Sequence, residues 1–268
     1  MILVTGGTSF NASDFLKTSD HKFVIILNKS KPIIFKENIV YFKSVKEFID
    51  SEYKRKVKII INFASSYNFR NNLKNNFLSS FYILFKIYKL LKNENLNMII
   101  NIGSYFQDSK TEKYTSYVFI KNFTDYFFKL IPKNIKYINL KLGDTYGPGD
   151  NRNKIFKHLR LNSYKDEINF SGNPNDIFYL TNYVLISKAL NSIVLNQSLF
   201  INSNITIVRL FGEPITLLEI VNIYKKISNL NFKAKFNGKK ITRKKIASFD
   251  VDYAFLFDKD KNKEIRLI

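Results

Sequence analysis

The stretch MILVTGGTSFNAS, residues 1–13, decides the fold of this protein. Its first four residues are apolar and predict a β-strand, which leads into Thr5-Gly6-Gly7, and a helix is predicted after this turn. A strand, a glycine turn and a helix in this order open a nucleotide-binding α/β unit, in which the helix N-terminus receives phosphate. We therefore expect a cofactor loop here.

Two positions in this loop depart from the usual glycine pattern. Ser9 and Ala12 stand where a dinucleotide-binding loop ordinarily has glycines, which allow close approach of the pyrophosphate and close packing of the helix on the strand. Alanine adds one methyl group. The Cβ of Ser9 would crowd a phosphate unless the loop shifts, although its hydroxyl and the helix amides can still bind an anion. We interpret the loop as functional; the alternative is a chain that keeps the fold and has lost the cofactor.

Apolar runs that alternate with helical segments predict the rest of the fold. The runs cover residues 1–5, 22–27, 57–64, 98–103, 135–142 and 198–203. Helices are predicted over 73–92 and 113–131 from apolar spacings of three and four. This alternation is typical of an α/β protein with a Rossmann-like, doubly wound parallel sheet.

Glycines and prolines become frequent from about residue 146, which indicates a change in the organisation of the chain. We assign residues 1–145 to the dinucleotide-binding domain, with a returning segment at about 176–204. Residues 146–175 and 205–268 are assigned to a small C-terminal substrate-binding lobe.

The composition narrows the possible functions. The 268 residues include no cysteine and two histidines, so we expect no metal site. The formal net charge of +21 suits a polyanionic ligand such as a nucleotide, but the lysines are spread along the chain rather than clustered, so no specific nucleic acid is expected. The sequence shows neither a secretory signal nor an apolar run of membrane-spanning length, which favours a cytoplasmic protein without membrane insertion.

A Tyr-x-x-x-Lys pattern at Tyr117 and Lys121 carries the strongest chemical signal. Spacing of four residues on a helix puts both side chains on one face, where the ammonium favours the phenolate. Ser104 ends the strand MIINIGS, 13 residues before Tyr117, at the sheet edge where doubly wound folds place their active sites. Ser104 could hydrogen-bond a substrate carbonyl oxygen that Tyr117 protonates.

Five segments in this order resemble the extended short-chain dehydrogenase/reductase family, which includes the NAD-dependent epimerases and dehydratases. They are TGG at 5–7, INFAS at 61–65, INIGS at 100–104, YVFIK at 117–121 and YGPGD at 146–150. The segments at 100–107 and 140–156, with GKKITRKKI near the end, look like the branch of nucleotide-sugar 4-ketoreductases such as CDP-abequose synthase. The resemblance implies reduction of a nucleoside-diphosphate-4-keto-6-deoxy sugar for surface-polysaccharide synthesis.

The resemblance also implies roles for individual residues. Ser104, Tyr117 and Lys121 would form the catalytic set, with Tyr117 as proton donor and Lys121 also holding the nicotinamide ribose. The expected cofactor contacts are Gly6, Thr8, Ser9, Phe10, Asn28, Lys29, Lys31, Ala64 and Lys121. The expected substrate contacts are Tyr105, Arg152, Lys154 and Arg243.

The end of the second strand indicates which cofactor is used. An acidic residue there would bind the adenosine ribose and repel a 2′-phosphate, but this chain has Asn28-Lys29-Ser30-Lys31. NADPH is therefore expected, with NAD possible.

Two other enzymatic functions and one non-catalytic function remain open. An epimerase or dehydratase with bound NAD is the enzymatic alternative, although the aromatic residues after Ser104 argue against dehydration. A nucleotide-binding protein without catalysis is the other alternative. A homodimer is expected, because the two apolar helices offer a surplus apolar face and the family usually dimerises through helices.

Overall fold

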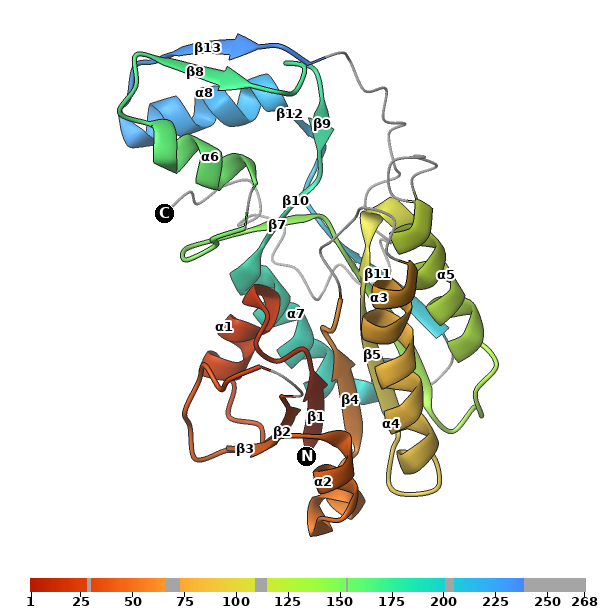
Figure 1. Ribbon diagram of the computed structural model, residues 1–268. Helices are drawn as coiled ribbons and strands as arrows, with labels where there is room; N and C mark the ends of the chain where they lie inside the picture. Colours follow the sequence, from red (N-terminus) through yellow and green to blue (C-terminus); the bar gives the residue numbers. More distant parts are fainter. Residues whose placement is uncertain (28–29, 66–72, 109–114, 153, 201–204, 239–268) are drawn as a thin grey trace.

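A computed structural model describes residues 1–27, 30–65, 73–108, 115–152, 154–200 and 205–238. Within these residues, seven parallel strands form the central sheet in the order β11-β6-β5-β4-β1-β2-β3 (Figure 1). The strands are β1 (Ile2–Thr5), β2 (Phe23–Ile26), β3 (Ile39–Phe42), β4 (Ile59–Asn62), β5 (Met98–Ser104), β6 (Lys136–Leu142) and β11 (Ile205–Leu210). The expected Rossmann-like, doubly wound sheet is confirmed.

The apolar runs became strands because both faces of the sheet are covered. All residues of β1, β2, β4 and β5 are buried, which explains why these runs do not alternate with polar residues. The strand expected at 198–203 is wrong for residues 198–200, because Gln197–Phe200 form a short 3-10 helix, η5, and the edge strand is β11; residues 201–203 lie outside the described residues. The run of β-branched residues ITIVRL extends the sheet beside β6, whereas the short run at 198–200 only closes the preceding helix.

Helices cover both faces of the sheet. On one face, α1 (Phe10–Thr18) packs beside α7 (Tyr183–Leu195). On the other face lie α2 (Val45–Ile49), α3 (Leu73–Phe77), α4 (Ile83–Leu91) and α5 (Thr115–Phe128), together with the 3-10 helix η1 (Glu52–Lys56). A second 3-10 helix, η3 (Tyr105–Gln107), follows the carboxyl end of β5. A π-helical turn at Leu78–Tyr82 joins α3 to α4, so the helix predicted over 73–92 is one continuous rod (Figure 1).

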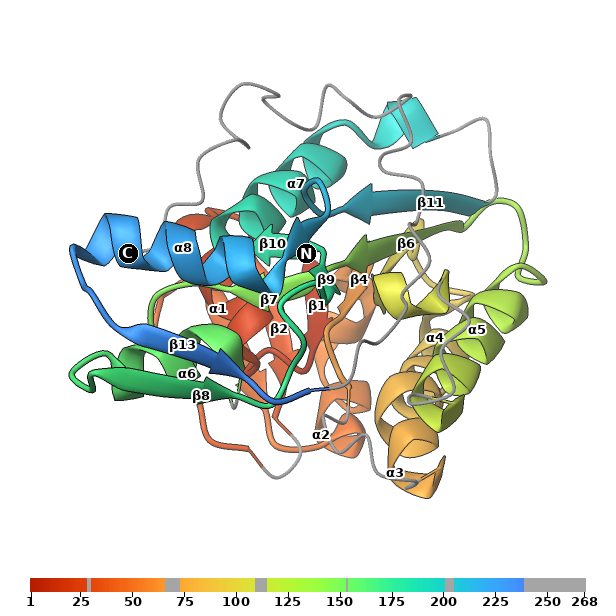
Figure 2. The same ribbon diagram turned by 90° about the horizontal axis from the view of Figure 1, so that it is seen from above.

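The small lobe lies above the carboxyl edge of the sheet (Figures 1 and 2). It contains α6 (Ile155–Asn162), α8 (Leu217–Ser228), and β8 (Glu167–Phe170) paired in parallel with β13 (Lys233–Phe236). Short pairs connect it to the sheet: β7 (Asp144–Tyr146) with β10 (Leu180–Asn182), and β9 (Ile177–Phe178) with β12 (Ile215–Thr216). The lobe has its own apolar core, to which Leu159, Phe170, Leu217 and Ile220 contribute.

The sequence assigns residues 205–268 to the small lobe, but residues 205–210 form the edge strand of the main sheet. Residues 239–268 of this assignment lie outside the described residues. The segment that returns to the main sheet therefore extends to residue 210, beyond the expected end at 204. The second segment of the small lobe follows it and includes α8.

Candidate active site

The glycine turn at residues 5–7 joins β1 to the N-terminus of α1. Gly6 has a φ of +67°, and a Cβ at this position would lie 2.6 Å from the backbone N of Ala64. Glycine is therefore needed for the backbone conformation and for the close approach of the loop after β4. Ala12 is fully buried in the core beneath α1, so alanine meets the packing demand that glycine ordinarily meets in such loops.

Ser9 stands at the N-cap of α1 with an extended backbone, and its amide donates to the Gly6 carbonyl at 2.9 Å. Its Oγ is buried and has no hydrogen-bond partner in the described part of the chain. A buried hydroxyl usually has a partner, and the N-terminus of a helix attracts anions. Thr8 and Phe10, on either side of Ser9, are partly exposed. These features fit the pyrophosphate of a dinucleotide.

Ser104, Tyr117 and Lys121 line one cavity of about 250 Å³, called the small cavity here. Ser104 is the last residue of β5, and Tyr117 and Lys121 lie one turn apart on α5. The structure thus brings the sequence-predicted catalytic residues together. Arg152 and Lys154 line the same cavity.

Lys121 lines the small cavity with a side chain that is almost entirely buried. Its side chain is 2% exposed, and its Nζ donates to the Ile102 carbonyl at 2.6 Å. The same Nζ lies 5.8 Å from the centroid of the Tyr117 ring. Burial lowers the pKa of Lys121 to about 8, while the charge of Asp125 opposes this shift. At neutral pH the ammonium form therefore still prevails beside the tyrosine.

Ser104 caps the short helix η3 (Tyr105–Gln107). Its Oγ accepts from the Phe106 amide at 3.4 Å, and its own amide donates to Gln107 Oε1 at 2.9 Å. This capping box fixes the backbone of the serine at the edge of the sheet.

Tyr105, an expected substrate contact, lies elsewhere. It is 1% exposed within an aromatic cluster with Tyr179 and Phe211, and its hydroxyl donates to Asp144 Oδ2 at 3.0 Å. A fully buried ring cannot meet a substrate without a large rearrangement, so the structure corrects this expectation. Tyr105 instead supports the carboxylate of Asp144.

Arg152 connects the small lobe to the cofactor loop. Its guanidinium makes two bonds to the carboxylate of Asp150, at 2.7 and 2.6 Å, and one to Thr145 Oγ1 at 2.9 Å. It also lies 4.6 Å from the centroid of the Phe10 ring, which stacks on Tyr183. Because the guanidinium charge is already paired with a carboxylate, this arrangement favours a bridging role between the two parts over direct binding of a substrate phosphate.

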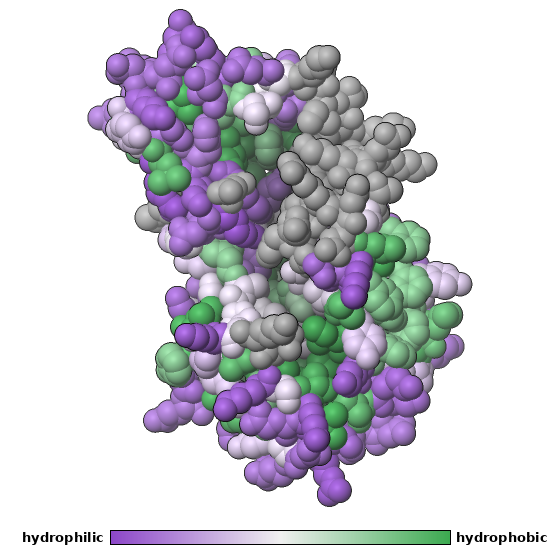
Figure 3. Space-filling view, viewed as in Figure 1, coloured by the Kyte–Doolittle hydropathy of each residue, from purple (hydrophilic) through white to green (hydrophobic). Residues whose placement is uncertain are grey.

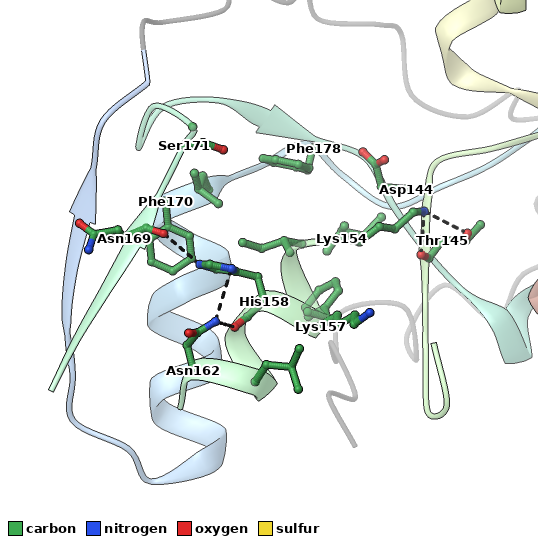
Figure 4. A pocket seen from close by; sticks show the side chains of 16 residues that line it. Asp144, Thr145, Lys154, Lys157, His158, Asn162, Asn169, Phe170, Ser171 and Phe178 are labelled. Atoms are coloured by element: carbon green, nitrogen blue, oxygen red, sulfur yellow. Dashed lines mark hydrogen bonds between the residues drawn. The ribbon is translucent and has the colours of Figure 1, made fainter. Parts of the chain in front are cut away.

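Lys154 lies where the small cavity meets a second one of about 630 Å³, the large cavity. Its Nζ donates to the Thr145 carbonyl at 3.1 Å, as Figure 4 shows. Burial lowers the pKa of Lys154 to about 8, and the charge of Asp144 opposes the shift. A partly desolvated ammonium between two cavities can attract an anion that spans them.

Sequence reasoning missed residues around the large cavity. Asp144 lines both cavities, and its signal was a position just after a predicted strand, like that of Ser104. On the small-lobe side, the His158 ring contacts the carbonyl of Asn169 at 2.9 Å and packs on Phe170 (Figure 4). The packing of α6 on β8 brings His158 and Asn169 together, so local sequence patterns do not predict this contact.

Some of the expected cofactor and substrate residues lie outside the described residues, namely Asn28, Lys29 and Arg243. Lys31 is described and exposed. Within the described part of the chain, no helix is both long and apolar enough to cross a membrane.

No protein-family model matches the sequence, and no curated protein matches it either. The fold and the cavity at the carboxyl edge define a Rossmann-like protein with a small lobe. Solved structures that share this fold include nucleotide-sugar 4-epimerases, some of them in complex with NAD.

Three of these structures illustrate the likeness. A UDP-glucuronic acid 4-epimerase from Bacillus cereus, in complex with UDP-4-deoxy-4-fluoro-glucuronic acid and NAD, has a TM-score of 0.72 at 16% identity, over 89% of this chain and 86% of that chain. A UDP-N-acetylglucosamine 4-epimerase from Methanobrevibacter ruminantium has 0.71 at 16%, over 89% and 85%. A UDP-glucose 4-epimerase from Thermotoga maritima has 0.71 at 14%, over 89% and 86%. At these identities the likeness establishes the fold.

Proposed function

We propose that this protein is a nicotinamide-dependent oxidoreductase of a nucleotide-linked sugar, and specifically an NADPH-dependent reductase of a nucleoside-diphosphate-4-keto-6-deoxy sugar. The observation that carries the proposal is the meeting of Ser104, Tyr117 and Lys121 in one cavity beside the glycine turn. The cavity adjoins a larger one in the small lobe, which gives room for the nucleotide. Such a product would supply surface-polysaccharide synthesis.

The three side chains have distinct tasks in this proposal. When bound, the nicotinamide would supply a hydride for the C4 carbonyl carbon. Tyr117 donates its phenolic proton to the C4 oxygen, and the Ser104 hydroxyl orients that oxygen. The Lys121 ammonium favours the phenolate that remains. Its buried position keeps this charge close to the tyrosine and away from water.

The cofactor loop would hold the dinucleotide through the features described above. The Ser9 hydroxyl and the first amides of α1 would donate to the pyrophosphate, and Gly6 lets the turn pass close to Ala64. The preference for NADPH rests on the sequence 28–31, which offers lysines and no carboxylate to a 2′-phosphate.

The nucleotide would extend into the large cavity. Lys154, at the junction, is the better candidate for the diphosphate, because the guanidinium of Arg152 is already paired with Asp150. The apolar floor of this cavity includes Phe170 and Phe178, whose rings suit the flat face of a base (Figure 4).

A 4-epimerase with bound NAD is the second candidate function. It is favoured by the likeness to solved 4-epimerases, one of which is in complex with NAD in three structures. Both functions use the same tyrosine and lysine, and they differ in the fate of the cofactor. A reductase releases oxidised NADP, whereas an epimerase returns its NAD unchanged.

The first test is a titration of the purified protein, stripped of nucleotide, with NADPH and with NADH, followed by nicotinamide fluorescence. Tighter binding of NADPH supports the reductase. Binding of neither cofactor would remove both enzymatic proposals and favour a non-catalytic nucleotide-binding protein.

The second test adds substrates and distinguishes the two reactions. Stoichiometric oxidation of NADPH by a 4-keto-6-deoxy nucleotide sugar supports the reductase. Interconversion of UDP-glucose and UDP-galactose, or of UDP-glucuronic acid and its 4-epimer, without net change in the nicotinamide supports the epimerase. Tyr117→Phe is the control in both assays, because it keeps the ring and removes the proton donor.

A further inference from the structure

A partly buried carboxylate lies one helical turn beyond Lys121, facing away from the small cavity. Asp125 accepts hydrogen bonds from the Tyr137 hydroxyl at 2.6 Å, from Gln107 Nε2 at 2.6 Å and from Asn139 Nδ2. Burial raises the pKa of Asp125, whereas the bonds from Tyr137 and Gln107 oppose that shift. Three donors from a strand and a turn thus converge on one helical side chain.

Gln107 connects Asp125 to Ser104 through hydrogen bonds to both residues. Its Oε1 accepts from the Ser104 amide at 2.9 Å, while its Nε2 donates to Asp125. Gly103 makes room for the arrangement, because a Cβ there would lie 2.6 Å from Gln107 Oε1 and 2.1 Å from Asn139 Oδ1. The amide side chain is therefore a direct link between the turn that carries Ser104 and the helix that carries Tyr117.

A row of buried polar side chains crosses the sheet beneath this link. Asn62, Asn101 and Asn139 are in register on β4, β5 and β6, and each is fully buried. Asn62 Nδ2 donates to Asn101 Oδ1 at 2.8 Å, and Thr5 Oγ1, at the end of β1, donates to Asn62 Oδ1 at 2.5 Å. Asn139 donates to Asp125, and its Oδ1 is buried without a hydrogen-bond partner within the described residues, so the bonded row from Thr5 ends at Asn101.

We propose that Asp125 is a positioning residue, which with Gln107 clamps the Ser104 turn to the helix that carries Tyr117 and Lys121. The inference rests on the proposed function for its catalytic consequence. Neither Asp125 nor Gln107 lines the small cavity, so the clamp acts through the geometry of the groups that do. Loss of the clamp lets the serine hydroxyl move relative to the phenol, and catalysis is sensitive to such displacements.

The test uses the full chain and variants of it. Asp125→Asn removes the charge and replaces by a donor one of the two acceptor oxygens, which serve Tyr137 on one side and Gln107 and Asn139 on the other. In the double variant Asp125→Asn with Gln107→Glu, an amide donor at position 125 can meet a carboxylate at position 107 that still accepts from the Ser104 amide, although Asn139 Nδ2 then loses its acceptor. Thr124→Val is the matched control, because Thr124 is buried on the same helix and its hydroxyl donates to the Ile120 carbonyl of that helix.

Two quantities are measured: amide hydrogen exchange of segment 98–107, and kcat and KM with the nicotinamide and nucleotide sugar that the wild type uses. In Asp125→Asn we expect exchange at residues 104–107 to rise roughly tenfold. We expect kcat to fall roughly 10- to 100-fold with KM nearly unchanged. The double variant recovers the part of both losses that the bond between residues 107 and 125 carries, and the control changes neither. Gln107→Met, on a short turn at the surface of the sheet edge, should reproduce the effects of Asp125→Asn if that variant does not fold.

Unchanged exchange at residues 104–107 in Asp125→Asn, or in Gln107→Met, overturns the clamp. So does a rise in KM with kcat unchanged, or a double variant no better than the single one. A wild-type protein that turns over no nucleotide sugar, but whose Ser104 turn still loosens in Asp125→Asn, refutes the proposed function and leaves the clamp supported.

Discussion

The Lys121 Nζ lies 5.8 Å from the centroid of the Tyr117 ring and is anchored from below by the Ile102 carbonyl. This anchor comes from β5, the strand that ends in Ser104. The same strand therefore fixes the position of Ser104 and of the Lys121 ammonium, whereas the position of Tyr117 is set by α5.

Replacing Tyr117 by phenylalanine should lower turnover by roughly 10²- to 10⁴-fold, because the proton donor to the sugar oxygen is lost. Nicotinamide binding should stay close to that of the wild type, since the cofactor loop is untouched. Steady-state kinetics and the fluorescence titration measure the two effects. Turnover that survives in this variant would assign the proton transfer to another group.

The free energy of unfolding should depend on pH partly through the titration of Lys121. The pKa of Lys121 is about 8 in the folded state, below the ordinary 10.5, so between these values the unfolded chain binds a proton that the folded chain lacks. The free energy of unfolding therefore rises with pH between these two pKa values. Below pH 8 the folded protein carries the whole desolvation cost of the charged lysine. Urea unfolding of Lys121→Met should show a smaller rise from pH 8 to 10 than the wild type.

Lys86→Met serves as the control for this measurement, because Lys86 is exposed on α4. It should keep the wild-type dependence on pH. A slope in Lys121→Met equal to that of the wild type would show that the lysine is not desolvated.

Gly6→Ala should destabilise the protein by about 1–3 kcal/mol, because a non-glycine residue is strained at positive φ. Its Cβ would also collide with the backbone near Ala64 and displace the cofactor loop. Gly212→Ala is the matched control, since the nearest atom to its Cβ lies at an ordinary 3.7 Å. Thermal unfolding compares the two, and equal melting temperatures would contradict the strained turn.

The apolar surface over α3, α4 and α5 predicts a homodimer. Figure 3 shows hydrophobic side chains gathered over these helices. On α5, Phe119 is 60% and Tyr126 64% exposed. Exposed apolar patches of this kind mark association surfaces. Light scattering at micromolar concentration should give twice the 31.5 kDa chain mass, and Phe119→Glu should give a monomer.

Phe35→Glu controls for this substitution, because Phe35 is 82% exposed on a loop after β2, away from the patch. It should leave the dimer intact. A wild-type monomer at these concentrations would refute the prediction directly.

Much of the fold and part of the site could be predicted from local pattern. The buried runs of β1, β4 and β5 predict their strands because a sheet covered on both faces needs continuous apolar sequence. Tyr117 and Lys121 could be paired because helical spacing is local. The run at 198–203 misled the prediction, since a short apolar stretch does not distinguish a strand from the end of a helix.

The sequence by itself determined the strand and helix alternation, the glycine turn at Gly6 and the tyrosine–lysine pair, because each depends on residues a few positions apart. Tertiary structure decided which polar groups meet. It turned Tyr105 into the core and onto Asp144, placed the guanidinium of Arg152 over the Phe10 ring, and gathered distant donors around Asp125. Such contacts join residues far apart in the chain, and only the packing of helices on the sheet brings them within hydrogen-bonding distance.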